Sequence, residues 1–220
     1  MRVSIAYLAA LVPLVTVLAA RLDAAEPLPD AAQGVAAYQA GEYERAFELL
    51  KEPADGGDLQ ARYLMARLLS GDLPDIRSYP VAMRYLNERA RCYSPDALNL
   101  YGYLMTHLQT HSKRISYQNL LIYKEAALAG SLRAAFNLGK NIAEFYDRPF
   151  LGAAYIWEAA EAGHTPSQSI KSQILASQLA ETMVAQIERV IARGPPTTRW
   201  PTLRDTDRVC RSFTIGPTAE

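Results

Sequence analysis

The chain has 220 residues, half of them hydrophobic, which is enough apolar material for one compact or elongated domain. Its 23 basic residues balance its 23 acidic residues, so the formal net charge is zero. This balance gives no reason to expect nucleic acid as a partner, because proteins that bind nucleic acid carry a basic surface for the phosphates.

Residues 1–25 have the composition of a signal peptide. Arg2 supplies the positive start, residues 5–17 form an apolar run, and small residues follow from Ala19 onward. We therefore expect a periplasmic or secreted protein that loses its first 19 to 25 residues and then has no membrane span. An uncleaved membrane anchor is the alternative, although the apolar run is short for a spanning helix.

Helix signals begin directly after this segment. Gly41 marks a tight turn between two helices. Asp58 is a good N-cap for the next helix, and Pro80 suits the first turn of a later one. The expected elements here are helices over residues 31–40, 42–52 and 58–70, a loop over residues 71–78, and a helix that begins near Pro80.

Ser94 and Pro95 open a further helix pair, since Ser is a good N-cap and Pro fits the first helical position. Ser116 and Ser131 can cap the helices after them. Residues 167–193 are expected to form one long final helix with a polar outer face, which suits the open end of an array. Its apolar stripe consists of Ile170, Ile174, Leu179, Met183, Ile187 and Val190.

A frame of small residues recurs along the chain, in which Ala is followed by Gly three residues later and by Ala seven residues later. The frame begins at Ala54, Ala90, Ala127 and Ala160, at intervals of 36, 37 and 33 residues. Tyr93 replaces the glycine of the second frame, and Ser167 replaces the last alanine of the fourth. We interpret the first Ala as the end of one helix, the Gly as its left-handed cap and the second Ala as part of the next helix. Recurrence at this interval predicts an all-α array of helix pairs.

The segments that carry this frame resemble a known family. Residues 134–139 and 153–163 are similar to a Sel1-like repeat, a relative of the tetratricopeptide repeat, and residues 34–57 resemble a shorter copy. The resemblance covers about residues 31–163. It implies a right-handed solenoid of antiparallel helix pairs, with about four repeats followed by the long capping helix. Such repeats usually serve as binding scaffolds.

The chain therefore divides into a signal peptide (1–25), a repeat solenoid (26–193) and a tail rich in Pro and Arg (194–220). Trp200 and Phe213 favour partial packing of the tail on the solenoid, and a disordered tail is the alternative.

Cys92 and Cys210 are the two cysteines of the chain. Two cysteines in an exported chain most often pair, so we predict a disulfide between them. Two separate buried thiols are the alternative. A bridge would pin the tail against the second repeat.

The sequence contains no catalytic signature. It has no Gly-rich phosphate loop, no Gly-x-Ser-x-Gly elbow and no cysteine pair at metal-binding spacing. His107 and His111 are four residues apart, but no third metal ligand is indicated, so solvated histidines are the preferred interpretation. Glu158 and Glu161 are interpreted as solvated surface. We therefore expect no enzyme activity, no cofactor and no metal.

The resemblance also implies a concave binding face formed by the first helix of each pair. The expected positions lie one residue before the second Ala of the frame and two, six and ten residues after it. They are Gln60, Tyr63, Arg67, Asn99, Tyr103, His107, Arg133, Phe136, Lys140 and Glu144. Aromatic and Arg side chains often anchor interfaces, so truncating Tyr103 or Arg67 should weaken binding with little effect on stability. The alternative for Tyr63 and Phe136 is a place in the core.

The expected function is binding of another protein in the periplasm, with an envelope complex component as one kind of partner. An immunity protein that neutralises an antibacterial effector, such as a type VI phospholipase, is the alternative within this class. An enzyme acting on the cell wall and a purely structural envelope component represent two other classes.

Overall fold

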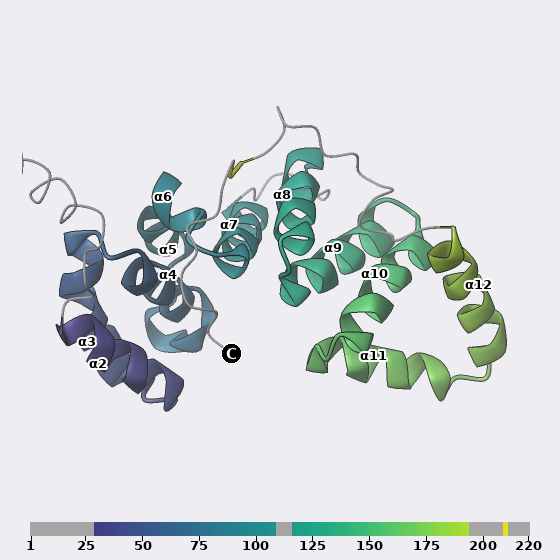
Figure 1. Ribbon diagram of the computed structural model, residues 1–220, viewed down its shortest axis with the longest axis horizontal. Coiled ribbons are helices and arrows are strands. Elements are labelled where there is room, and N and C mark those ends of the chain that lie inside the picture. Colours follow the sequence, from purple (N-terminus) through teal and green to yellow (C-terminus); the bar gives the residue numbers. More distant parts are fainter. Residues whose placement is uncertain (1–28, 109–115, 194–208, 211–220) are drawn as a thin grey trace, which may run out of the picture.

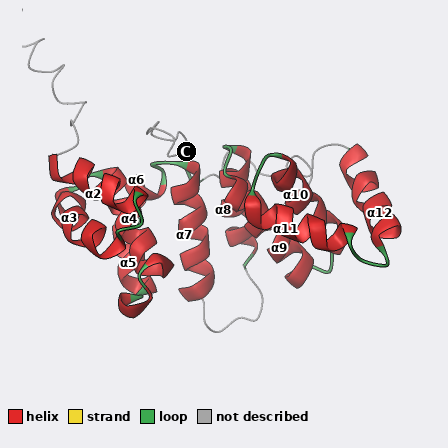
Figure 2. Cartoon of the chain, turned by 90° about the horizontal axis from the view of Figure 1, so that it is seen from below, coloured by secondary structure: helices red, strands yellow, loops and turns green. Residues whose placement is uncertain are grey.

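The structure is a computed structural model that describes residues 29–108, 116–193 and 209–210. In these ranges the chain is all-α, with no sheet, and its helices pack in sequential pairs (Figures 1 and 2). The all-α prediction is thus confirmed. The expected signal peptide, His111, Trp200 and Phe213 lie outside the described residues. None of the helices in the described ranges has the length and apolar character needed to cross a bilayer.

The described helices differ widely in length, from a single turn to nearly four turns. The α-helices are α2 (Pro29–Gln39), α3 (Tyr43–Gly56), α4 (Leu59–Arg67), α5 (Tyr79–Tyr85), α6 (Glu88–Arg91), α7 (Pro95–Leu108), α8 (Tyr117–Leu128), α9 (Leu132–Phe145), α10 (Pro149–Glu161), α11 (Thr165–Leu175) and α12 (Ala180–Ala192). A π-helix (Leu68–Asp72) continues α4, and a 3-10 turn (Pro74–Ile76) follows it, so the expected loop over residues 71–78 is partly helical.

The turns of the repeat frame have the predicted conformation. Gly57, Gly130 and Gly163 have φ angles of 102°, 107° and 97°, which lie in the left-handed region that glycine adopts without strain. Ala61 and Ala134, the second alanines of two frames, are fully buried. Each frame therefore joins the last helix of one unit to the first helix of the next.

The four predicted caps are confirmed as well. In each case a side-chain oxygen accepts a hydrogen bond from the backbone N–H three residues later, which satisfies a group that the helix itself leaves free. The pairs are Asp58 with Ala61 at 2.7 Å, Ser94 with Ala97 at 3.1 Å, Ser116 with Asn119 at 3.3 Å, and Ser131 with Ala134 at 3.1 Å.

The single capping helix predicted over residues 167–193 is wrong, because α11 ends at Leu175 and α12 begins at Ala180. The Ser177 hydroxyl donates to the Ile174 carbonyl at 2.8 Å, and this local bond competes with helix continuation. The bend lets both α11 and α12 pack on α10, and Ile187 of α12 becomes fully buried. A straight helix would carry Ile187 away from α10.

In the first helix pair, the end of α3 differs from the prediction. α3 continues to Gly56, past the expected end at Glu52, with Pro53 inside the helix and buried. Proline near the end of a helix removes only one backbone donor. Gly57 then caps the helix, because its N–H donates to the Ala54 carbonyl at 3.1 Å.

The core follows the arch that the helices describe in Figure 1, where α2 and α11 lie at the two lower ends and α8 lies near the top. The largest cluster of buried apolar residues extends from α2 to α7. A second cluster joins α8, α9 and α10 around Tyr123 and Tyr155. A third links α7, α8 and α9, and it includes Cys210 from the tail.

Candidate binding surface on the opening helices

We call the first helix of each pair, α2, α4, α7, α9 and α11, an opening helix. Arg67 of α4 is held by contacts at the α2 end of this series. Its Nη2 atom lies 3.3 Å from Asp72 Oδ2, and the Tyr38 hydroxyl donates to the same oxygen at 2.6 Å. The guanidinium also lies 6.0 Å from the centre of the Tyr38 ring. Arg67 therefore joins α2 to α4, and its truncation is expected to lower stability as well as any binding.

Tyr63 and Asn99, two of the predicted surface residues, are mostly buried, with exposed fractions of 9% and 7%. Tyr63 packs with its ring centre 6.4 Å from that of Tyr93. Burial raises the pKa of Tyr63, and the charges of Arg67, Asp96 and Arg133 also act on it. Tyr63 thus belongs to the core, as the alternative interpretation held, in the apolar cluster that α4 shares with α7.

Tyr103 and His107 of α7 form an aromatic cluster with Tyr79, the first residue of α5. The ring of Tyr103 lies 4.1 Å from that of His107 and 6.2 Å from that of Tyr79, measured between centres. Burial, together with the hydrogen bond to Tyr79, raises the pKa of Tyr103 to about 12, so its hydroxyl remains protonated. Tyr103 is half-buried and His107 is exposed, so this cluster is reachable from solvent.

The contacts continue from α7 through α9 to the start of α11. The Asn137 side-chain amide donates to Asn99 Oδ1 at 2.9 Å. The ring of Phe136 lies 5.3 Å from that of His164, measured between centres. Phe136 is half-buried. Side-chain contacts therefore join α2 to α4, α7 to α9 and α9 to the start of α11, while α4 and α7 share one apolar cluster.

The remaining predicted residues lie on α4 and α9, and solvent can reach them. Arg133, Lys140 and Glu144 of α9 are exposed, and Gln60 of α4 is half-buried. Together with Tyr103, His107 and Phe136, they are the residues of the predicted binding face that solvent can reach. We call this set the solvent-accessible part of the opening helices.

Three residues that contact the predicted binding face were not predicted from the sequence, namely Tyr38, Tyr79 and His164. Tyr38 and Tyr79 lie on helices to which the frame rule was not applied. His164 follows the frame glycine Gly163 and occupies the N-cap position of α11, a position that the rule for the binding face does not include. The same place in the other frames holds Asp58, Ser94 and Ser131, so a ring at this position was a usable signal.

The pKa of His164 provides a test of how nearby charges act at the start of α11. Burial lowers its pKa, the Arg133 charge lowers it further, and the Asp96 carboxylate acts in the opposite direction. Because the unfolded chain then binds the proton more readily, stability falls as pH drops through the ordinary histidine value of about 6.5. Arg133→Gln is expected to raise the pKa of His164, as followed by NMR titration of its imidazole. Arg45→Gln, an exposed change on α3, should leave that pKa in place, and an equal pKa in both variants would contradict the assignment.

A shallow hollow of about 250 Å³ lies away from this surface, between α3, α4 and α5. Several of its polar groups bond to other groups of its lining. Arg62 Nε donates to the Ala54 carbonyl at 2.8 Å, and the Tyr85 hydroxyl donates to Asp55 at 3.3 Å. Arg62, Tyr85 and Asp55 in its lining are therefore already engaged.

Of the two acidic residues expected at the solvated surface, Glu161 is exposed, whereas Glu158 is partly covered by the protein. Glu161 forms an ion pair with Lys171, whose ammonium lies 4.4 Å from the centre of the Trp157 ring. Glu158 is half-buried, and burial raises its pKa. Among the residues that the structure places, no group of three His, Cys, Asp or Glu side chains is arranged to hold a metal ion.

Comparison with protein-family models, with curated proteins and with solved structures finds no match for this chain.

Proposed function

We propose that the chain is a right-handed solenoid of about four Sel1-like repeats. The repeat frame supports this, since each copy coincides with a junction between helix pairs and three of its glycines are left-handed. The arch in Figure 1 also supports it, because stacked pairs that rotate slightly against one another curve the array.

The proposed function is binding of another protein through the solvent-accessible part of the opening helices, without catalysis. The observation that carries this proposal is the series of interactions from Tyr38 to His164. Side-chain contacts join α2 to α4, α7 to α9 and α9 to the start of α11, and one apolar cluster contains residues of both α4 and α7. Helices that are already held in place lose little conformational entropy when a partner binds to their exposed aromatic and charged side chains. Tyr103 and His107, with Arg133 and Lys140, have the chemistry of interface anchors and their polar rim.

We place this function in the periplasm or outside the cell. The disulfide between Cys92 and Cys210 supports an oxidising compartment, and the composition of residues 1–25 supports export. A component of an envelope complex or an exported effector is the class of partner that this location would supply.

The test uses a partner captured from a periplasmic extract and identified by mass spectrometry. Tyr103→Ala is expected to weaken binding of the purified partner by about 1–3 kcal/mol, as at an interface hot spot. Because Tyr103 also contacts Tyr79 and His107, binding is measured at a temperature at which the variant is folded. The matched control is Phe150→Ala, because Phe150 is also a partly exposed aromatic residue but lies on α10. Equal Kd values for Tyr103→Ala and wild type would contradict the proposed surface, and a loss confined to Phe150→Ala would place binding on the other face.

A further inference from the structure

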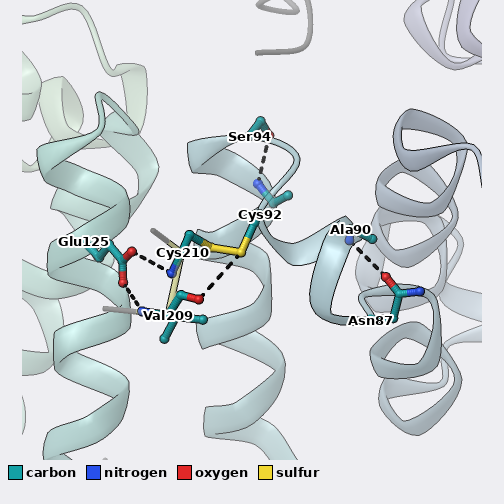
Figure 3. Close-up of a disulfide and its surroundings, with 8 residues drawn as sticks. Asn87, Ala90, Cys92, Ser94, Glu125, Val209 and Cys210 are labelled. Atoms are coloured by element: carbon teal, nitrogen blue, oxygen red, sulfur yellow. Dashed lines mark hydrogen bonds between the residues drawn. A yellow bond between two sulfur atoms is a disulfide. The ribbon is translucent and has the colours of Figure 1, made fainter. Parts of the chain in front are cut away.

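The two cysteines of the disulfide are held in place by different interactions. Cys92 lies in the short connector between α6 and α7 (Figure 3). Caps fix both sides of this connector, since the Asn87 side chain accepts from the Ala90 N–H at 3.0 Å and the Ser94 side chain accepts from the Ala97 N–H. Cys92 is therefore positioned by its own local structure.

Cys210 lies outside the described helices, and its main chain is held by Glu125 of α8. The Val209 N–H donates to Glu125 Oε2 at 2.7 Å, and the Cys210 N–H donates to Oε1 at 2.8 Å. Figure 3 shows the carboxylate directed at these two residues, next to the disulfide. Only 4% of Glu125 is exposed, so both bonds are shielded from water. Hydrogen bonds to an ionised acceptor are stronger than neutral ones, and here one carboxylate uses both oxygens.

The side chain of Cys210 also enters an apolar site. It packs with Leu98 of α7, Ile122 of α8 and Ala134 of α9, and the two Cα atoms of the bridge are 5.6 Å apart. The tail is thus attached by contacts that do not require the S–S bond itself.

We propose that Glu125 is a positioning residue for the Cys92–Cys210 bridge, which binds the main chain at residues 209 and 210 and brings the two thiols together before they are oxidised. A disulfide oxidant such as oxidised glutathione completes the reaction. One protein thiolate attacks it and releases one glutathione, and the second protein thiolate displaces the other. The two protein thiols lose two protons and two electrons, and the oxidant is reduced to two thiols.

The proposal predicts a high effective concentration of the two thiols in the folded, reduced chain. It is measured by equilibrating the full chain with reduced and oxidised glutathione under native conditions. Glu125→Gln is expected to lower it by about tenfold or more, because the amide NH₂ cannot accept and faces a buried N–H donor. Glu48→Gln, an exposed change on α3, should leave it unchanged.

Ile142→Val separates this effect from a general loss of stability. Ile142 is fully buried and belongs to a different cluster from Cys210, so its truncation destabilises the chain but should not change the effective concentration. If Glu125→Gln keeps the wild-type value, or if Ile142→Val lowers it equally, the proposal is overturned.

A second measurement examines the tail without the bridge. In C92S/C210S the backbone amides at positions 209 and 210 are expected to remain protected from hydrogen exchange, and adding Glu125→Gln should remove that protection. Free exchange of both amides in C92S/C210S, with Glu125 present, would show that the covalent bond alone holds the tail and would also overturn the proposal.

Discussion

Replacement of both cysteines, in C92S/C210S, is expected to lower the free energy of unfolding by about 2–5 kcal/mol. The bridge joins residues 118 positions apart, and such a long connection restricts the unfolded chain more than a short one. The contacts of Glu125 and of the apolar site around residue 210 persist in the folded variant, so we expect the loss to arise chiefly in the unfolded state. Guanidinium denaturation of the full-length variant and of oxidised wild type measures it.

Two controls accompany this measurement. Thiol labelling of unfolded, unreduced wild type should find no free thiol, because the two cysteines are paired. Reduced wild type should have the same denaturation midpoint as C92S/C210S. If the oxidised protein unfolds at that midpoint too, the bridge contributes nothing to stability.

Local features of the fold could be predicted from the sequence because their causes lie within a few residues. A glycine three residues after an alanine implies a left-handed cap, and a Ser or Asp at the right place implies an N-cap. Gly130 with Ser131 is an example in which both predictions are confirmed in adjacent residues. Pairing of Cys92 with Cys210 could be predicted because the chain offers no other partner.

Features that depend on distant contacts could not be predicted in this way. The apolar stripe of residues 167–193 fits one helix, but packing of α12 on α10 bends it near Ser177. Arg67 has the side chain of an interface anchor, yet Asp72 and Tyr38 already engage it. Glu125 resembles any surface carboxylate on a helix, and its role appears only when the tail lies beside it.

The crossing of α9 and α10 shows the same division between local and distant causes. In α9 the large Leu138 is followed by Gly139, and a small residue at this place suits a helix that packs closely on a neighbour. The partner glycine, Gly152 of α10, has no local signal. A Cβ atom at Gly139 would lie 2.5 Å from the Gly152 carbonyl oxygen, and one at Gly152 would lie 2.3 Å from the Gly139 carbonyl oxygen. The two backbones therefore touch at these glycines.

Gly152→Ala is expected to lower the free energy of unfolding by about 3 kcal/mol, at the upper end of the usual cost of overpacking. The added methyl would also lie 2.7 Å from the Ala143 Cβ atom, so relief requires a shift of a helix rather than of a flexible side chain. Gly56→Ala is the matched control, because Gly56 is also helical but a Cβ atom there meets nothing within 4 Å. Alanine favours helix by up to about 1 kcal/mol over glycine, so this control should be neutral or stabilising. Urea denaturation of the two variants and wild type gives the comparison, and equal stabilities of Gly152→Ala and wild type would show that α9 and α10 do not meet at backbone contact.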